Sequence, residues 1–443
     1  MLTVDRDQVL LERLNRHSHL RARMESLLGV VEDAAGDCQK ADAAERRVIE
    51  ELRQMGHDAL TAWAERGVEK QAVLAQAEPD WRPGGKKLYW HTTFGPIEVI
   101  EPLWRNGTGI ERPFSAVAGV SCRCSSLPLQ RVMTDFGADA AFGRVPAKLQ
   151  EHYGIAMPVS AIQRTTEHHA EGIYQQEVAR VIDPGTAAGV IFIGELDGSM
   201  VPVVEPSPDA ADQRKDKRLG WKEVRLNLAH PMGSVSPIFG GNFAGGVEES
   251  GRQWGRCAAK AGFGPGSQLH AVGDGAPWIA KQMDLQFGTQ GRYLVDFFHV
   301  CEYLGAAAQV CAPDHPRAWL DVQKERLTAN QATAVLDALA PFVSANDDNP
   351  VTACDRYLRN RLDQLDYQGA IQRGLPIGSG EIESAHRYII QERLKLPGAW
   401  WSPDHIETML ALRLNRANRE WEAYWQGVEK QTAGTSQAVV ASL

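Results

Sequence analysis

Four acidic residues stand where the sequence predicts that a strand ends or a helix begins. Asp197, Asp274 and Asp296 each follow an apolar segment typical of a buried strand, and Glu383 lies one turn into a helix opened by Gly378-Ser379-Gly380. Open α/β sheets form their active sites at the ends of neighbouring strands. Carboxylate oxygens without a Cys or His shell suit Mg²⁺, and two such ions roughly 3.5–4 Å apart would assist phosphoryl transfer. These carboxylates are therefore candidates for a metal-dependent site.

Each carboxylate also has a purely structural interpretation. Asp197 stands before a glycine, as turn residues do, and Asp274 is placed to cap the helix that follows it. Asp296 and His299 fit an N-cap and a core histidine, and Glu383 precedes an arginine by four residues, the spacing of a surface ion pair. Spacing also leaves open a glycosidase that uses two of these carboxylates. The sequence contains no Gly-x-x-x-x-Gly-Lys phosphate loop, Gly-x-Ser-x-Gly elbow or His-Glu-x-x-His motif.

The elements that must position these residues follow an α/β pattern from about residue 183. The predicted strands are 189–196, 200–204, 224–228, 269–273 and 293–295. Asp197-Gly198-Ser199 is predicted as the hairpin turn between the first two, 205–219 as an exposed loop and 239–246 as a Gly-rich connection. The chain from about 299 to 366 is predicted to be helical, and a final helix ends near Gln426.

The first 182 residues predict helices, a strand pair and a helix-turn-helix. Ile49, Leu52, Leu60 and Trp63 fall near heptad spacing, which favours an amphipathic helix in a hairpin or a self-association arm. Two strands, 88–93 and 97–104, follow. A helix over 145–153, a turn over 154–157 and a helix from 158, with Ser160 and Gln163 as a capping box, outline the helix-turn-helix. Most such corners are structural.

Composition limits the classes of protein. The 443 residues allow two to four domains, and the net charge is 47 − 56 = −9. Net acidity argues weakly against a nucleic-acid partner, but 101–150 carries six basic and four acidic residues, whereas 151–200 carries two and seven. No apolar stretch approaches the ~18 residues of a membrane helix, and no secretory signal is visible. Seven cysteines, an odd number, predict a reducing, cytosolic protein.

Four short motifs occur in a recognisable order. They are Gly-Glu-Leu-Asp-Gly-Ser-Met at 194–200, Gly-Asp-Gly-Ala-Pro-Trp-Ile at 273–279, Asp-Phe-Phe-His at 296–299 and Gly-Ser-Gly-Glu-Ile-Glu-Ser at 378–384. The sequence resembles the DDE transposases of bacterial insertion sequences, most closely the ISKra family, from about residue 88 to 426. The resemblance extends to Arg-Leu-Lys at 393–395, Trp-Trp-Ser at 400–402, Phe94-Gly95 and the segments 127–142 and 154–164. One departure is Trp-Arg-Asn-Gly at 104–107, where relatives are expected to carry a Cys-containing strand end.

The resemblance implies an α/β RNase H-like catalytic domain with an all-α insertion, preceded by α-helical and helix-turn-helix DNA-binding regions. By motif match, Asp197, Asp274 and Glu383 are the catalytic residues and hold two Mg²⁺ or Mn²⁺ ions; Glu383 is preferred to Glu381. Asp296 and His299 match an accessory Asp-x-x-His signature of Mutator- and hAT-like relatives. Together with the sequence pattern, the resemblance divides the chain into 1–80, a helical region that is a candidate for dimerisation or for packing on its own chain; 81–182, for DNA binding; 183–300 and 377–430, the two parts of the catalytic core; 301–376, the insertion; and 431–443, a flexible tail.

The implied partner is double-stranded DNA, both as transposon ends and as target. The residues expected to contact it are Arg144, Lys148, Gln163, Arg164, Trp278, Arg387, Arg393 and Lys395. The expected protein is a homodimer or larger assembly that cleaves and transfers DNA strands in the cytoplasm, at the nucleoid, and does not associate with membranes. Two alternatives stay open: an RNase H-like nuclease without strand transfer, and a DNA-binding transposase descendant that does not cut.

Overall fold

The computed structural model describes residues 6–33, 41–75, 81–106, 109–120, 123–186, 188–207, 216–345 and 348–442. The chain forms two compact units. The first comprises Met1–Thr166 with Glu422–Leu443, and the second comprises Glu167–Trp421. The boundary falls inside one long helix, α7 (Val159–Ala179).

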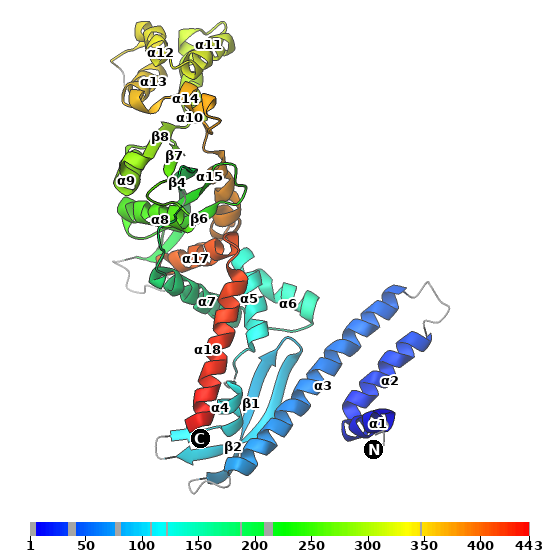
Figure 1. The fold of residues 1–443 in the computed structure, drawn as a ribbon. Helices are drawn as coiled ribbons and strands as arrows, with labels where there is room; N and C mark the ends of the chain where they lie inside the picture. Colours follow the sequence, from blue (N-terminus) through cyan, green and yellow to red (C-terminus); the bar gives the residue numbers. More distant parts are fainter. Residues whose placement is uncertain are drawn as a thin grey trace. The chain divides into compact units, whose positions relative to one another are not determined.

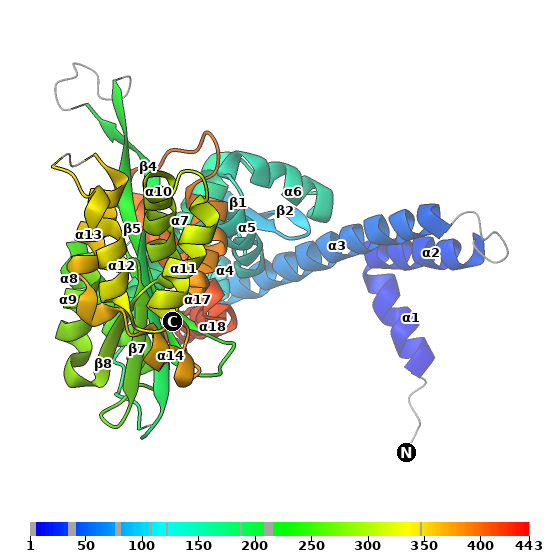
Figure 2. The same ribbon diagram turned by 90° about the horizontal axis from the view of Figure 1, so that it is seen from above.

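The first unit begins with three helices, α1 (Arg6–Arg16), α2 (Ser18–Asp33) and α3 (Ala41–Ala75). α2 and α3 lie side by side as an antiparallel hairpin (Figure 2). Arg23 of α2 joins them, since its guanidinium lies 3.4 Å from Glu51 and 3.2 Å from Asp58 of α3. The hairpin interpretation of this segment is thus confirmed.

α3 also packs against a small antiparallel sheet of β1 (Trp81–Thr92), β2 (Gly95–Asn106) and β3 (Gly109–Glu111), next to α4 (Pro113–Ala118). The β1–β2 hairpin confirms the predicted strand pair. Thr92 pairs with Gly95, whose φ of +106° suits a residue without a side chain. The apolar core of this layer consists of Ala64, Val68, Leu88, Ile97, Val99, Phe114 and Val120.

Three helices form the predicted helix-turn-helix region: α5 (Leu127–Asp139), α6 (Val145–Tyr153) and the start of α7. They enclose the buried side chains Leu129, Met133, Val145, Leu149, Ile155, Met157 and Ile162. α6 ends at Gly154, whose φ of +66° is the left-handed helix stop. The predicted capping box at Ser160 is wrong, because α7 starts one residue earlier and the carbonyl of Pro158 accepts the first helical hydrogen bonds.

The second unit contains a five-stranded sheet in the order β6-β5-β4-β7-β8 (Figure 1). Its strands are β4 (Ile191–Pro206), β5 (Lys217–Pro231), β6 (Ile238–Asn242), β7 (Gln268–Gly273) and β8 (Gly291–Val295). β4, β7 and β8 run parallel, whereas β5 pairs antiparallel with both β4 and β6. The expected mixed α/β core preceded by helices is confirmed.

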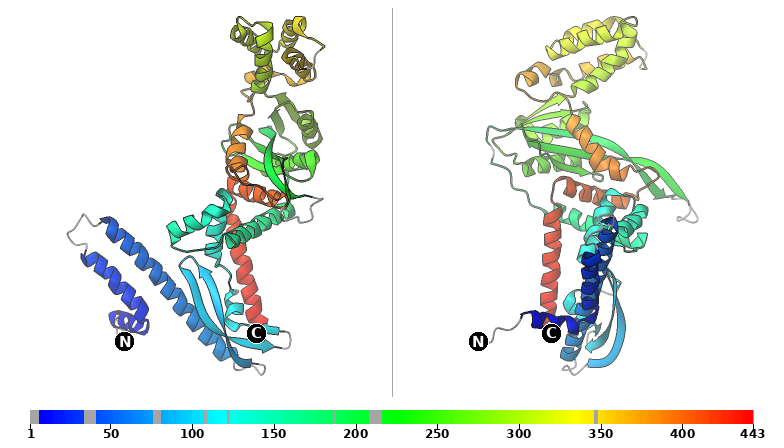
Figure 3. Two further views of the ribbon diagram at one scale, coloured as in Figure 1. Left: turned by 180° about the vertical axis from the view of Figure 1, so that it is seen from behind. Right: turned by 90° about the vertical axis from the view of Figure 1, so that its right-hand side faces the viewer.

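The predicted turn at Asp197-Gly198-Ser199 is wrong. β4 continues straight through these residues and pairs with β5 from Phe192↔Pro231 to Pro206↔Lys217. The Asp-Gly pair is locally a turn signal, but fifteen cross-strand partners outweigh it. The two strands form a long ribbon that extends from the sheet (Figure 3, right). The predicted Gly-rich connection at 239–246 is also corrected, because it begins with the edge strand β6.

Helices cover both faces of this sheet (Figure 1). α8 (Gly246–Lys260) and α9 (Pro277–Phe287) lie on one face, and α15 (Gly380–Ala385) and α17 (Ile406–Ala417) on the other. The helical insertion comprises α10 (Phe297–Cys311), α11 (Pro316–Thr328), α12 (Ala332–Leu339), α13 (Pro350–Arg359) and α14 (Tyr367–Gln372). It shares one apolar core with the α8/α9 face, which includes Leu196, Trp254, Ile279, Val300 and Leu358.

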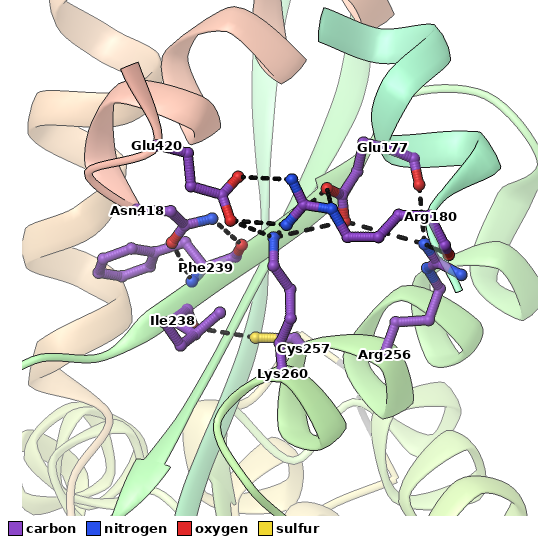
Figure 4. A network of polar contacts seen from close by, with 9 residues as sticks. All are labelled: Glu177, Arg180, Ile238, Phe239, Arg256, Cys257, Lys260, Asn418 and Glu420. Carbon is purple, nitrogen blue, oxygen red and sulfur yellow. Dashed lines mark hydrogen bonds and ion pairs between the residues drawn. The ribbon is translucent and has the colours of Figure 1, made fainter. Parts of the chain in front are cut away.

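A polar network ties the end of α7 to the sheet's helices (Figure 4). Arg180, just after α7, lies 2.7 Å from Glu420, and Lys260 of α8 lies 3.0 Å from Glu420 and 3.3 Å from Glu177. Asn418 completes it by hydrogen bonding to both backbone groups of Phe239 on β6. These contacts fix the end of α17 against the edge of the sheet.

The terminal helix α18 spans Trp421–Ser442 and so continues well past Gln426, where the sequence predicts its end. No proline follows Gln426 to stop it. Among the described residues, no helix combines the length and the apolar content that crossing a bilayer requires.

Candidate active site

The register of three parallel strands places three aspartates level with one another. Glu195 of β4 pairs with Val272 of β7; Asp197 stands two residues further along β4, and Asp274 stands two residues after Val272, directly after β7. Gly273 in turn pairs with Val295 of β8, and the next residue, Asp296, donates its backbone N–H to the Gly273 carbonyl at 2.7 Å. The three aspartates therefore occupy neighbouring positions across the sheet, with Asp274 and Asp296 after strand ends as predicted and Asp197 within β4.

Asp197 and Asp274 keep access to solvent. The side chain of Asp197 is 35% exposed on the continuous strand β4, and Asp274 is half-buried directly after β7. Asp274 accepts a hydrogen bond from the backbone N–H of Ala276 through Oδ1, at 2.8 Å, and its Oδ2 makes no hydrogen bond with the described residues. Asp274 thus shapes the turn before α9 while retaining a carboxylate oxygen.

Asp296 has a structural role. Its Oδ1 accepts from the N–H groups of Phe298 and His299 and caps α10, and its Oδ2 accepts from the backbone and hydroxyl of Ser379, both at 2.6 Å. Asp296 is buried, and its partners occupy both oxygens. His299 lies against the rings of Tyr303 and Tyr357. The N-cap interpretation of Asp296 is therefore confirmed, and the residue anchors the segment that leads into α15.

A second buried carboxylate, Glu195, holds the same helix. Its Oε2 accepts the backbone N–H of Ile382 at 2.7 Å, in the first turn of α15, where the helix dipole favours negative charge. Burial raises the pKa of Glu195 to about 8, against the lowering effect of this hydrogen bond. Nearby, His230 lies 3.1 Å from Glu381. Burial lowers the pKa of His230, but its contacts with Glu381 and the Pro231 carbonyl raise it overall.

These anchors position α15 beside β4. Ser379 is bound by Asp296 after β8, Ile382 is bound by Glu195 of β4, and His386 lies beside Asp197 of β4. The chain therefore passes from the end of β8 to β4 as it enters α15, whose Glu381 lies beside His230 of β5. Glu383 lies on this helix and is exposed, and the ion pair that its spacing offers with Arg387 is not formed between these two described residues. The structure thus brings the element that bears Glu383 to β4, the strand of Asp197.

His386 is a site residue that the sequence analysis missed. Its Nε2 lies 3.2 Å from Asp197 Oδ2, and the imidazole is buried. Neither ring nitrogen makes a hydrogen bond of acceptable geometry in the described structure. A buried imidazole without such a bond is costly unless a group or ligand satisfies it. It starts a π-helical segment, His386–Gln391, a distortion found often at functional sites.

The donor set fits a hard divalent cation, but the side chains are not gathered around one. Asp197, Asp274 and Glu383 offer only oxygen, as Mg²⁺ prefers. Among the described residues, no three His, Cys, Asp or Glu side chains are close enough together to hold a metal ion as they stand. A shared ion therefore requires these side chains to reorient. Beside Asp197, the Nδ1 of His386 is buried and has no hydrogen-bond partner among the described residues.

The predicted DNA-contacting residues of the second unit lie in different environments. Trp278, in α9, is half-buried on the opposite face of the sheet, with the guanidinium of Arg225 5.6 Å from its ring. Arg387 is exposed, and the ammonium of Lys395 donates to the Ser199 hydroxyl. Arg393 is 1% exposed and lies over the ring of Trp401, so direct DNA contact by Arg393 has no support in this conformation.

The predicted DNA-contacting residues of the first unit gather on the helix-turn-helix. Arg144 and Lys148 are exposed at the start of α6, and Arg164 is exposed in the second turn of α7, where its Nε donates to the Ser160 carbonyl. Gln163 is half-buried beside it.

Local signals existed for two of the missed residues. Glu195 precedes Asp197 by two residues and so shares its face of the strand, and His386 follows Glu383 by three residues and so shares its face of the helix. Both spacings can be read from the sequence and would have identified Glu195 and His386 as neighbours of the predicted carboxylates. No local pattern identifies partners more distant along the chain, such as Tyr357, whose hydroxyl donates to the Asp274 carbonyl at 2.6 Å.

Comparisons with known proteins give only distant structural similarity. No protein-family model matches the sequence, and no curated protein matches it. Among solved structures, the chain is similar to the Drosophila P element transposase strand transfer complex, at 10% identity over 73% of this chain and 86% of that chain, with a TM-score of 0.24. The similarity assigns the chain to no family.

Glu195 makes stability depend on pH. The native carboxyl keeps its proton up to about pH 8, whereas the unfolded one releases it near its ordinary pKa of about 4.3. The native state binds more protons between these values, so the free energy of unfolding falls as pH rises through this window. We expect Glu195→Gln to flatten the fall in Tm between pH 5 and 8 in the absence of metal. Glu205→Gln, on the same strand, is the control; an unchanged slope in Glu195→Gln would contradict the assignment.

His386 should matter to chemistry more than to folding. Replacing a residue that orients a metal-binding side chain typically costs about 10–100-fold in activity or metal affinity. We expect His386→Ala to lower metal-dependent DNA cleavage by roughly that factor, with partial recovery in His386→Gln. Cleavage rates are compared with thermal melting of the same preparations. A fall in rate that only tracks the loss of folded protein would leave His386 a packing residue.

Proposed function

We propose that this protein is a DNA transposase that binds transposon ends and catalyses metal-dependent phosphodiester cleavage and strand transfer. The observation that carries the proposal is the strand register that sets Asp197 and Asp274 level on neighbouring strands, with the segment that enters the helix of Glu383 held by Asp296 after β8 and by Glu195 on β4. Carboxylates from separate elements, placed beside the ends of parallel strands, suit the binding of divalent cations to a phosphodiester.

Two Mg²⁺ or Mn²⁺ ions fit this proposal. Asp197 and Asp274 would hold one, and Glu383 with Asp197 would hold the second. When bound, such a pair lowers the pKa of a water molecule and neutralises charge on the transferring phosphate. The proposal requires these side chains to reorient, because no three metal-ligating side chains converge among the described residues.

The chain's own groups then act by position. Asp197 and Asp274 are held by the strand register, and His386 lies against the Oδ2 of Asp197. Water attacks the phosphorus at the transposon end, the bond to the 3′ oxygen breaks, and the products are a 3′-hydroxyl and a 5′-phosphate. That hydroxyl then attacks a phosphodiester of target DNA and displaces its 3′ oxygen. No covalent bond to the protein is needed.

DNA recognition belongs to the helix-turn-helix in this proposal. α7 supplies Gln163 and Arg164 near its N-terminus, the part of a recognition helix that meets base edges. Arg144 and Lys148 on the preceding elements are placed for phosphates. Two ends must be cut together, which favours a homodimer or larger assembly.

A non-catalytic DNA-binding descendant is the second candidate. It is favoured by one observation, namely that no three metal-ligating side chains converge among the described residues. Incubating the protein with candidate end DNA and Mg²⁺ or Mn²⁺, followed by mapping of the products, separates the possibilities. Joined products support transposition, cut but unjoined DNA supports a nuclease, and binding without cutting supports the descendant.

Removing one carboxylate should abolish chemistry and spare DNA binding. We expect Asp197→Asn, Asp274→Asn and Glu383→Gln each to lower cleavage by about a thousandfold, which corresponds to ~4 kcal/mol of transition-state stabilisation. The matched control is Glu381→Gln, which changes an exposed glutamate on the same helix and should cleave within a few fold of the wild type. A Glu383→Gln protein that cuts normally while Glu381→Gln does not would transfer the role to Glu381.

The helix-turn-helix predicts two kinds of binding defect. Arg164→Ala and Gln163→Ala should weaken binding to end DNA by about 1–3 kcal/mol and reduce discrimination against unrelated DNA. Lys148→Ala should weaken binding to both DNAs alike and reduce the salt slope by about one. Affinities are measured at several salt concentrations, with Lys70→Ala, an exposed lysine on α3, as the control. Equal loss on both DNAs for Arg164→Ala would assign it to phosphate contact.

A further inference from the structure

The helical insertion reaches back to the carboxylate-bearing edge of the sheet. Tyr357, in α13, donates its hydroxyl to the backbone carbonyl of Asp274 at 2.6 Å. Arg361, directly after α13, donates Nε to the carbonyl of Gly275 at 2.7 Å. Tyr367, in α14, donates its hydroxyl to the carbonyl of Val295 at 3.0 Å, one residue before Asp296. Three side chains of the insertion thus bind the ends of β7 and β8.

The turn at Gly275 is shaped to receive these groups. Gly275 has a φ of +81°, and a Cβ there would lie 2.6 Å from both Arg361 Nε and the Tyr357 hydroxyl. Its N–H donates to the Tyr293 hydroxyl of β8 at 3.0 Å. Together with the Asp274–Ala276 hydrogen bond, these contacts occupy the turn's polar groups on several sides. A side chain at this position would displace the insertion.

The two clamping side chains are themselves held in place. The ring of Tyr357 stacks on Tyr303 of α10 with centroids 4.2 Å apart, and the guanidinium of Arg361 lies 3.9 Å from the centre of the Tyr357 ring. Arg361 also donates to the Tyr357 carbonyl at 2.9 Å. Tyr357 is 6% exposed, so little water is available to replace the Asp274 carbonyl as the hydrogen-bond partner of its hydroxyl.

We propose that the helical insertion is a clamp that sets the position of the Asp274 turn, with Tyr357 and Arg361 as its positioning residues. Neither residue touches the reacting atoms. They act through the backbone of Asp274 and Gly275, and so they fix where the second carboxylate stands relative to Asp197. The consequence for catalysis rests on the proposed function, whereas the clamp itself is a property of the turn.

The test compares Tyr357→Phe and Arg361→Lys with two matched controls. Tyr357→Phe removes only the hydroxyl that donates to Asp274, and Tyr303→Phe removes the hydroxyl of the tyrosine stacked on it. Arg361→Lys retains the charge but loses the planar donor, and Arg359→Lys makes the same change at an exposed arginine two residues away. All four are made in the full chain, and their thermal melting is recorded.

The first readout is hydrogen–deuterium exchange of the peptide covering 273–280 in metal-free protein. The clamp predicts that exchange there speeds up several-fold in Tyr357→Phe and Arg361→Lys, without a comparable change in peptides from β4, and that both controls match the wild type. Unchanged exchange in the two clamp variants overturns the proposal, and so does uniformly faster exchange across the whole unit, which would indicate general destabilisation.

The second readout has two parts. Mn²⁺ binding is measured by calorimetry in the absence of DNA, and the rate of DNA cleavage is measured as a function of Mn²⁺ concentration. A displaced Asp274 should raise the half-saturating Mn²⁺ concentration by about tenfold, while the cleavage rate at saturating Mn²⁺ stays closer to the wild-type value. An unaltered Mn²⁺ affinity in both clamp variants overturns the positioning role. Failure of the wild type to bind Mn²⁺ would refute the proposed function instead, and the exchange experiment would still decide the clamp.

Discussion

The parallel register of β4, β7 and β8 is the constraint on which the candidate site depends. Neighbouring parallel strands present residues of equal register at the same height, so pairing Glu195 with Val272 and Gly273 with Val295 fixes the order Asp197, Asp274, Asp296 across the sheet edge. A slip by one residue would turn a side chain to the opposite face. Apolar residues that alternate with these carboxylates along the strands, such as Leu196 between Glu195 and Asp197, prevent this slip because they are buried against α8 and α9.

The carboxylates of this region divide into two kinds by burial. Asp296 and Glu195 are buried and bind backbone N–H groups, which offsets part of a desolvation cost of several kcal/mol per charge. Asp296 accepts from three backbone N–H groups and the Ser379 hydroxyl, whereas Glu195 accepts from the single N–H of Ile382, and burial raises the pKa of Glu195. Asp197 is partly exposed and Glu383 is exposed. The buried pair therefore supports α15, and the other two carboxylates are accessible to a ligand.

The sequence contains enough information to predict the strands of the core but not the way they connect. Strands 269–273 and 293–295 are short, apolar and followed by aspartate, and both are found within a residue or two of the prediction. The Asp-Gly pair at 197–198 misleads because turn chemistry is a local preference, whereas β4 is held by its whole length of pairing with β5. β6 was missed for a related reason, since two of its five residues are glycine.

The site residues show the same limit. Motifs predict Asp197, Asp274 and Glu383 as site residues, and period-two and helical spacing would add Glu195 and His386. Tyr357 and Arg361 stand 83 and 86 residues from their hydrogen-bond partners, with most of the helical insertion between them, so no window of sequence relates them to Asp274. Gly275 is a local sequence signal of the contact with Tyr357 and Arg361, because a glycine directly after Asp274 allows atoms of other residues to approach the backbone closely.

The way α15 is held bears on how a metal site would assemble. Its N-terminal turn is fixed at two points, by Asp296 through Ser379 and by Glu195 through Ile382. The side chain of Glu383, which follows these two points in the helix, is exposed to solvent. Closing the site would then cost the side-chain entropy of a glutamate, up to about 2 kcal/mol, rather than the larger cost of ordering a backbone segment. In the proposed function, a cation bound together with a DNA phosphate would supply the interaction energy that orders this side chain, so a site that is not gathered in the free protein is compatible with catalysis.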